Sequence, residues 1–337
     1  MACLSILLLF LPWGGAHPET ECAAPLKKFR LNLNNFHGLP TGILKNSRLR
    51  LEYLKTAGPR IVRLTLPGRP NLLAELPEAA IETPLGTYNF RGGHRLWCAP
   101  ESLPGTYSPD NDGLREEEIH EGVRLTGKAE PANGIVKVIE IRLSPELAKV
   151  TLRHELRNTG FRPVNLAPWT LTMLRLGGTA ILPQSIGIVD ACGMLPNRNL
   201  ALWPYTQIND TRLLFDDDFI LINAGASLAH AKIGYYNPFG WLAYWLEGVL
   251  FRKTFDVNLN ATYTDSGCNA EIYVDNNVIE LETLGPLGRL EPGKSFFHTE
   301  TWEFFDSLEQ PFIPSNLRER LEKEARFSLK NTERTVR

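Results

Sequence analysis

The 337-residue chain has no excess of positive charge and no concentrated run of lysine or arginine. Its 36 basic and 38 acidic residues give a net charge of −2. Because phosphate binding needs clustered Lys and Arg, nucleic acid is not an expected partner. An apolar run at residues 4–11 falls well short of the roughly 20 residues that a transmembrane helix needs, and no other stretch could cross a bilayer. Stable membrane insertion is therefore not expected either.

Several catalytic motifs are also absent. The sequence contains no HExxH, GxSxG, P-loop or GxGxxG motif, which excludes the usual zinc-protease, esterase, kinase and dinucleotide-binding interpretations. Two aspartate-rich segments, 110–113 and 216–218, lack the spacing of a calcium loop and are better interpreted as turns. We therefore expect neither a metal nor another cofactor.

Cysteine is scarce and has no metal-binding or redox spacing. The five cysteines form no CxxC motif; they are Cys3, Cys22, Cys98, Cys192 and Cys268. Loss of an N-terminal leader would leave four, enough for two disulfides in an exported protein. Nothing in the spacing specifies a pairing, so buried or free thiols are the favoured interpretation.

The N-terminus has the pattern of a signal peptide. The apolar run LSILLLFL is followed by Pro12, Trp13 and small residues ending at Ala16, where cleavage would occur. No Lys or Arg precedes the run, so a misassigned start or a buried N-terminal segment is the alternative. A cleaved leader implies export to the periplasm or the medium; without it the protein would be cytoplasmic.

The body of the chain is predicted to be all-β. Residues 60–66, 137–143 and 150–158 are rich in branched apolar residues or alternate between apolar and polar residues, which is typical of half-buried antiparallel strands. Glycine and proline occur throughout, as turns between many strands require. One helix is predicted over residues 316–329, capped by Ser315.

A hairpin at residues 268–284 concentrates carboxylates. Asn276-Asn277 fits a two-residue turn, because Asn tolerates positive φ. The register then places three residue pairs opposite each other: Asp275 with Val278, Tyr273 with Glu280, and Glu271 with Glu282. Two facing carboxylates repel unless a shared proton, a cation, a basic side chain or a ligand offsets them, and one of such a pair can serve as a general acid or base. The alternative is a solvated polar face.

A second candidate segment, residues 88–101, reads YNFRGGHRLWCAPE. His94, Arg95 and Trp97 follow two glycines, and an aromatic ring beside hydrogen-bond donors suits a sugar. A glycine bulge with a core tryptophan and a surface arginine explains the segment equally simply.

Four further side chains could belong to the core, the surface or the site. Trp169 and Trp203 sit in polar, loop-like contexts and could stack on a ligand, although most large aromatics belong to the core. Lys232, alone among small and apolar residues, could be a buried cation in the site, but a surface lysine is the simpler interpretation. His154 falls on the apolar face of its strand and is interpreted as a core histidine.

The order of these segments resembles the galactose mutarotase-like superfamily, the aldose 1-epimerase fold, and in particular a bacterial branch of it. The resemblance runs from residue 32 to residue 303 and rests on GPRIVRLTLPGRPNLLAELP, RGGHRLW, LRHELRNTGFRPVNLAPWTL and LETLGPL. It implies that Arg95 is the substrate-binding arginine and Glu282 the catalytic glutamate. The chain departs from the family where the catalytic histidine is expected, because residues 167–170 read Ala-Pro-Trp-Thr.

The sequence thus predicts a β-supersandwich of two large, mostly antiparallel sheets with a short C-terminal helix. Residues 1–16 form the predicted signal peptide, 17–308 the mutarotase-like domain and 309–337 the helical tail. The expected partner is a small or oligomeric carbohydrate on a concave sheet face, contacted by Arg95, Trp97, Trp169, Trp203, Lys232 and Glu271.

Three functions remain open at this stage. The first is an isomerase of the aldose 1-epimerase type, with Glu282 as base and His94 or Lys232 as acid. The second is a carbohydrate-binding module without turnover. The third is a structural domain of an exported protein.

Overall fold

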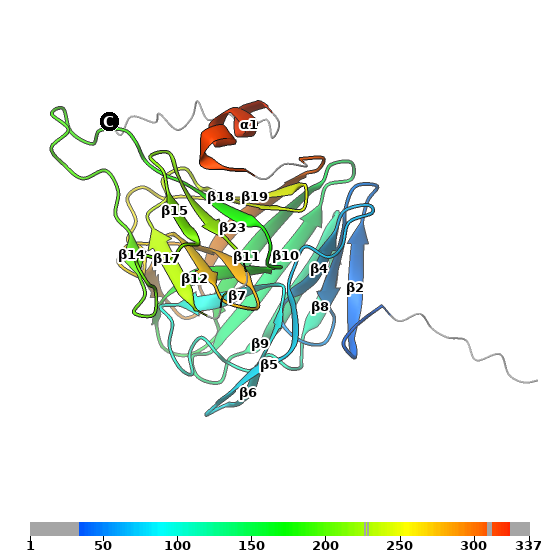
Figure 1. The fold of residues 1–337 in the computed structure, drawn as a ribbon. Coiled ribbons are helices and arrows are strands. Elements are labelled where there is room, and N and C mark those ends of the chain that lie inside the picture. The colour runs from blue at the N-terminus through cyan, green and yellow to red at the C-terminus, as the bar shows by residue number, and fades with distance from the viewer. Residues whose placement is uncertain (1–33, 226, 228, 309–311, 324–337) are drawn as a thin grey trace, which may run out of the picture. The chain divides into compact units, whose positions relative to one another are not determined.

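The alternating segments build two large antiparallel sheets that pack face to face (Figure 1). The computed structural model describes residues 34–323 except 226, 228 and 309–311. The predicted signal peptide lies outside the described residues, and so do Cys3, Cys22 and the C-terminal part of the predicted helix. The predicted β-supersandwich is confirmed.

The first sheet has eleven strands and carries the candidate site. Their spatial order is β1-β2-β3-β4-β7-β12-β21-β20-β17-β14, with β22 paired to β12. The strands are β1 (Asn35–Phe36), β2 (Leu39–Lys45), β3 (Arg50–Leu54), β4 (Ile61–Thr65), β7 (His94–Ala99), β12 (Val164–Leu174), β14 (Ala201–Leu202), β17 (Ala231–Tyr235), β20 (Ala270–Val274), β21 (Ile279–Leu284) and β22 (Gly288–Leu290).

The second sheet has ten strands, in the order β15-β16-β13-β18-β19-β23-β11-β10-β9-β8. They are β8 (Arg115–Ile119), β9 (Gly122–Ala129), β10 (Ile135–Leu143), β11 (Lys149–Asn158), β13 (Thr179–Pro183), β15 (Leu213–Phe215), β16 (Phe219–Asn223), β18 (Trp241–Leu246), β19 (Val249–Phe255) and β23 (Ser295–Phe305). A separate hairpin joins β5 (Glu75–Thr83) to β6 (Gly86–Gly92).

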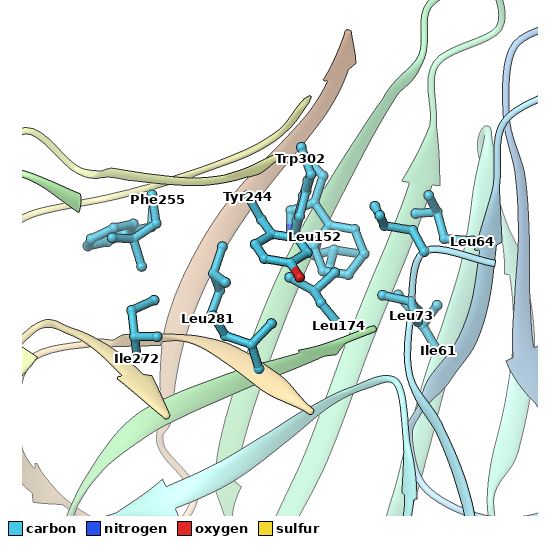
Figure 2. Close-up of a cluster of buried hydrophobic side chains, with 14 of the residues drawn as sticks. Ile61, Leu64, Leu73, Leu152, Leu174, Tyr244, Phe255, Ile272, Leu281 and Trp302 are labelled. Atoms are coloured by element: carbon cyan, nitrogen blue, oxygen red, sulfur yellow. The ribbon is translucent and has the colours of Figure 1, made fainter. Parts of the chain in front are cut away.

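The main core lies between the two sheets (Figure 2). Ile61 and Leu281 reach it from the eleven-stranded sheet, and Leu152 and Trp302 from the ten-stranded sheet. The predicted alternation is confirmed on β10, where Ile139 and Ile141 are fully buried. Burial of apolar area on this scale, at roughly 25 cal/mol per Å², is the main force that holds the sheets together.

A short C-terminal helix covers the outer face of the ten-stranded sheet. A 3₁₀ turn, η1 (Pro314–Asn316), leads into α1 (Leu317–Lys323), so the helix begins where the capping pattern predicted. Leu317 and Leu321 are buried with Phe219 and Trp241, which belong to β16 and β18. Helix α1 therefore packs on the ten-stranded sheet. Over the described residues, no helix has the length and apolar character needed to cross a membrane.

The cysteines inside the described part of the chain are free thiols. Cys98 and Cys268 are buried, and Cys192 is exposed. Burial raises the pKa of Cys268 to about 12, so this thiol stays protonated at neutral pH. The free-thiol interpretation holds for these three residues.

Candidate functional site

The carboxylate-rich hairpin has the register that the sequence predicted. Strands β20 and β21 place Glu271 opposite Glu282 and Tyr273 opposite Glu280, and the Asp275 amide bonds the Val278 carbonyl at 3.1 Å. Glu271 and Glu282 are 0% and 1% exposed. The solvated-face alternative is therefore wrong, and two facing carboxylates are buried in the sheet.

A buried lysine offsets this pair of carboxylates. Lys232 Nζ lies 2.7 Å from Glu271 Oε2 and 2.9 Å from Glu282 Oε2. It comes from β17, the strand next to β20, and is only 5% exposed. The interpretation of Lys232 as a surface residue is wrong, because the two carboxylates supply the partners that a buried ammonium requires.

The three groups shift the pKa values of Lys232 and Glu271 strongly. Burial alone would lower the pKa of Lys232, but the charges of Glu282 and Glu271 outweigh it and hold the pKa well above its ordinary value. Burial raises the pKa of Glu271 well above its ordinary value; the charge of Lys232 opposes this shift and that of Glu282 adds to it. Protonation is thus favoured at Glu271, and Lys232 contacts both carboxyl groups.

The Glu282 carboxylate is held from one side only. Its Oε2 atom accepts hydrogen bonds from Trp169 Nε1 at 2.8 Å and from Lys232 Nζ at 2.9 Å. No described residue donates a hydrogen bond to Oε1. One oxygen is thus fixed by the protein while the other stays available to a ligand.

Glu282 lines a pocket of about 740 Å³ on the outer face of the eleven-stranded sheet. Arg95 and Trp97 come from β7, Trp169 from β12 and Lys232 from β17, so these three strands, together with β21, supply the floor. Residues of the β5–β6 hairpin complete one wall. The volume is in the range of small-ligand sites.

Arg95 is stacked inside this pocket with spare donors. Its guanidinium carbon lies 4.1 Å from the centre of the Trp97 ring, and the residue is 2% exposed. Its Nε and Nη2 atoms have no hydrogen-bond acceptor among the described residues. Buried donors without a partner are rare, and a ligand oxygen would satisfy them.

Two predicted residues lie beside the pocket and do not line it. The Trp203 ring centre lies 4.6 Å from Lys232 Nζ, and the Trp169 ring centre lies 4.7 Å from the same atom. Glu271, fully buried, reaches the pocket only through Lys232. Both therefore position the lysine and do not meet a ligand directly.

His94 lies on the opposite face of β7, in the interior. Successive residues of a strand point to opposite faces, so with Arg95 in the pocket His94 must enter the core. Its ring nitrogens contact Thr172 Oγ1 at 2.9 Å and His154 Nε2 at 2.8 Å, and both histidines are fully buried. The geometry gives His94 no access to a ligand in this pocket, and the core assignment of His154 is confirmed.

The interior histidines are the one arrangement in the described chain with metal-ligand spacing. Ligand atoms of His94, His154 and Glu300 lie within 4.8 Å of one another. However, Lys253 Nζ is 2.9 Å from Glu300 Oε1, and Trp302 Nε1 donates to Oε2 at 2.9 Å. An ammonium already fills the role of the cation, so this group is interpreted as a hydrogen-bonded core cluster.

Glu280, Tyr273 and His230 are among the pocket residues that were not predicted as site residues. Glu280 lines the floor two residues before Glu282. The hairpin register that identified Glu282 also predicts that Glu280 lies on the same face. Tyr273 and the exposed His230 line the rim, where the Tyr273 hydroxyl and His230 Nδ1 are 2.6 Å apart. His230 stands alone in a loop, and no pattern in the sequence marks it.

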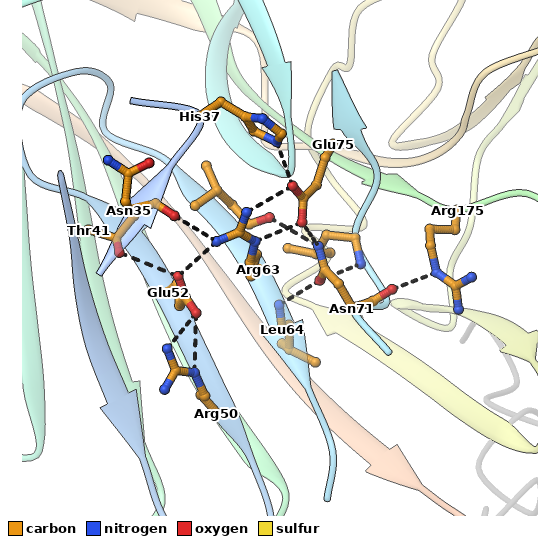
Figure 3. A network of polar contacts seen from close by, with 12 residues as sticks. Asn35, His37, Thr41, Arg50, Glu52, Arg63, Leu64, Asn71, Glu75 and Arg175 are labelled. Atoms are coloured by element: carbon orange, nitrogen blue, oxygen red, sulfur yellow. Dashed lines mark hydrogen bonds and ion pairs between the residues drawn. The ribbon is translucent and has the colours of Figure 1, made fainter. Parts of the chain in front are cut away.

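The pocket rim is acidic, and one of its carboxylates is neutralised from outside. Glu75 accepts bonds from Arg63 at 2.7 and 3.0 Å and contacts His37 at 2.7 Å (Figure 3). Glu78 and Glu101 are exposed and face the same opening. The unpaired charge around the opening is thus negative.

Solved structures share this arrangement of two sheets. The chain aligns with a candidate aldose 1-epimerase from Escherichia coli K12 at 12% identity and a TM-score of 0.51, over 80% of this chain and all of the other. A candidate mutarotase from Salmonella typhimurium aligns at 11% identity and a TM-score of 0.51, over 80% of this chain and 91% of the other. A galactose mutarotase related enzyme from Lactobacillus acidophilus aligns at 7% identity and a TM-score of 0.50, over 81% of this chain and all of the other.

The chain has the galactose mutarotase-like fold. No family model and no curated protein matches its sequence. In this mutarotase-like fold, the segment where the family resemblance expects a histidine, residues 167–170, lies in β12. That segment contributes Trp169, whose indole bonds Glu282.

Proposed function

We propose that the pocket binds an uncharged sugar and exchanges its anomers, with Glu282 as the base. The observation that carries this proposal is the asymmetric hold on Glu282: Lys232 and Trp169 saturate Oε2, and Oε1 is left to the pocket. A carboxylate oriented in this way can accept a proton from a hydroxyl group. The mutarotase-like fold agrees with this chemistry but does not by itself specify it.

The pocket offers both surfaces that a sugar needs. The rings of Trp97, Trp169, Tyr107 and Tyr205 supply apolar area for the C–H faces of a pyranose. Arg95 supplies unpaired donors for ring or hydroxyl oxygens. In the exchange step, Glu282 takes the proton of the anomeric hydroxyl while the bond between the anomeric carbon and the ring oxygen breaks.

Charge favours an uncharged sugar over a phosphorylated or acidic one. Both pocket cations already face carboxylates, Lys232 with Glu282 and Arg95 with Glu280 at 3.8 Å. A phosphate would meet the negative rim formed by Glu78 and Glu101, and Lys232 already contacts two carboxyl groups. Like charges repel, so sugar phosphates and uronates should bind more weakly than uncharged sugars.

The test is a thermal-shift screen of the purified protein against neutral monosaccharides, uronic acids, sugar phosphates and short oligosaccharides. A ligand that binds only the folded state stabilises it by RT ln(1 + [L]/Kd), so millimolar binders are detectable. Neutral sugars that raise the melting temperature are then assayed for anomer exchange by NMR. Glu282→Gln should keep the thermal shift and lower the exchange rate by about 10²–10⁴-fold.

Two results would overturn parts of this proposal. Absence of any sugar-induced shift in a well-folded protein would remove the sugar site altogether. Binding without exchange, unchanged by Glu282→Gln, would leave a carbohydrate-binding module without turnover. The residue 167–170 segment, which lacks the expected histidine, is the observation that favours this second candidate.

A further inference from the structure

We infer that Glu280 is the proton donor that works opposite Glu282, so that two glutamates of one strand form the acid and the base of the pocket. The inference rests on the proposed function, because it assigns a second catalytic residue to the same exchange. It also answers the problem raised by residues 167–170, where no histidine is available.

The two glutamates share one strand face. Glu280 and Glu282 are two residues apart on β21, so their Cα atoms are about 6.6 Å apart and their side chains point the same way. Both line the pocket. A sugar ring lying across β21 could therefore present its anomeric hydroxyl to one carboxyl group and its ring oxygen to the other.

The surroundings of the two carboxyl groups differ in a way that suits opposite roles. Glu282 accepts hydrogen bonds from a lysine and an indole. Glu280 receives no hydrogen bond from the described residues, and its nearest cation, Arg95 Nη2, is 3.8 Å away, beyond hydrogen-bond length. Two carboxyl groups in such different environments are suited to act as an acid and a base.

Burial raises the pKa of Glu280 to about 7; the charge of Arg95 opposes this shift and that of Glu282 adds to it. Near neutral pH a substantial fraction of Glu280 is therefore protonated. The titratable and charged groups that act on it from the neighbouring elements are Arg95, Glu282, Lys232, Lys253, Asp275, Tyr273 and Tyr107.

The exchange step balances with these two residues alone. Glu282 removes the anomeric hydroxyl proton, and the electron pair of that O–H bond forms the carbonyl of the open-chain aldehyde. The bond from the anomeric carbon to the ring oxygen breaks, and Glu280 gives its proton to that oxygen. After rotation about the adjacent C–C bond, the reverse step closes the ring on the other face and returns both protons.

Lys232 and His230 are competing proton donors in the described pocket, and Lys232 already contacts Glu271 and Glu282. The Nδ1 atom of His230 is already engaged with the Tyr273 hydroxyl at 2.6 Å, and His230 is exposed at the rim. Glu280 lies in the buried floor beside Glu282, where a proton donor is shielded from water. We therefore assign the role to Glu280.

The test compares four variants of the full chain: Glu280→Gln, Glu280→Asp, His230→Gln and the exposed control Glu291→Gln. Glu280→Gln should lower the anomer-exchange rate by about 10²–10⁴-fold and leave the sugar-induced thermal shift in place. Wild-type exchange should fall tenfold per pH unit above about pH 7, as Glu280 loses its proton. Glu280→Asp should retain measurable exchange and this alkaline fall.

The outcomes separate this inference from the proposed function. Exchange that survives Glu280→Gln, or a large loss on His230→Gln alone, would overturn the assignment. Binding without exchange in the wild type would also overturn it while sparing the sugar site. Loss of binding in every protein, including the Glu291→Gln control, would instead count against the sugar site itself.

Discussion

The side chain on which the pocket depends most is Lys232. Its ammonium is the only cation among the described residues that lies within 3 Å of Glu271 or Glu282. Water cannot take over its role at Glu271, which is 0% exposed and does not line the pocket. Removing one partner of a buried ion pair leaves a charge without compensation.

Lys232→Met should therefore lower the free energy of unfolding by about 3–5 kcal/mol, since Met has a similar length but no charge. Urea unfolding at pH 7 measures this loss. The double variant Lys232→Met, Glu282→Gln should lose less than the single variant, because the stranded charge is gone. Equal losses in the single and double variants would contradict the charge-pairing argument.

Individual strands explain how much of the site the sequence could predict. The Asn276-Asn277 turn and period-two alternation together fixed the pairing of Glu271 with Glu282, because a two-residue loop admits few registers. The same alternation on β7 could have excluded His94 as a partner of Arg95, since neighbours in a strand face opposite ways.

Contacts between strands distant in sequence could not be predicted. Lys232 meets Glu282 only because β17 pairs with β20, across 34 intervening residues from Tyr235 to Ala270. Trp169 reaches the same carboxylate because β12 pairs with β21. Neither pairing leaves a local pattern, so the sequence leaves Lys232 open between a buried site cation and a surface residue.

The terminal helix is an element whose contribution can be measured separately. Leu321 is fully buried against the outer face of the ten-stranded sheet, away from the residues that line the pocket. Leu321→Ala should lower the unfolding free energy by about 2–5 kcal/mol and leave sugar affinity unchanged. Leu147→Ala, at a leucine that is 58% exposed, is the matched control. A Leu321→Ala loss no larger than that of the control would show that the helix does not pack there.

At the scale of the whole molecule, polar bonds join the two sheets through the core. His94 on the eleven-stranded sheet contacts His154 on the other, and Thr283 Oγ1 donates to Glu300 Oε1 at 2.7 Å. Lys253 Nζ donates to Thr172 Oγ1 at 3.1 Å. A satisfied buried network of this kind favours one relative placement of the sheets over others.

This network should make stability depend on pH through its histidines. Burial lowers the pKa of His298 to about 3, although the charge of Glu300 opposes the shift. The unfolded chain binds a proton at this residue near pH 6.5 and the folded chain does not, so its contribution to stability falls as pH drops below about 6.5. The loss is about 1.4 kcal/mol per pH unit.

The measurement compares wild type with His298→Asn by urea unfolding between pH 7 and 5. Glu280 works in the opposite direction, because its raised pKa makes the folded state bind a proton in this range, so the difference between variants is the correct readout. The stability advantage of wild type should shrink by about 1.4 kcal/mol per pH unit below pH 6.5. The same comparison for the exposed His120→Asn should give no such slope; an equal slope in both would contradict the argument.

The ion pairing of Lys232 has a chemical consequence for the proposed exchange of sugar anomers. An open-chain aldose carries a free aldehyde, and a neutral amine beside it would condense to an imine and block the site. Glu282 and Glu271 keep the Lys232 nitrogen protonated, without the lone pair that attack on a carbonyl requires. The same carboxyl groups would thus protect the pocket from glycation by the open-chain sugar of the proposed exchange.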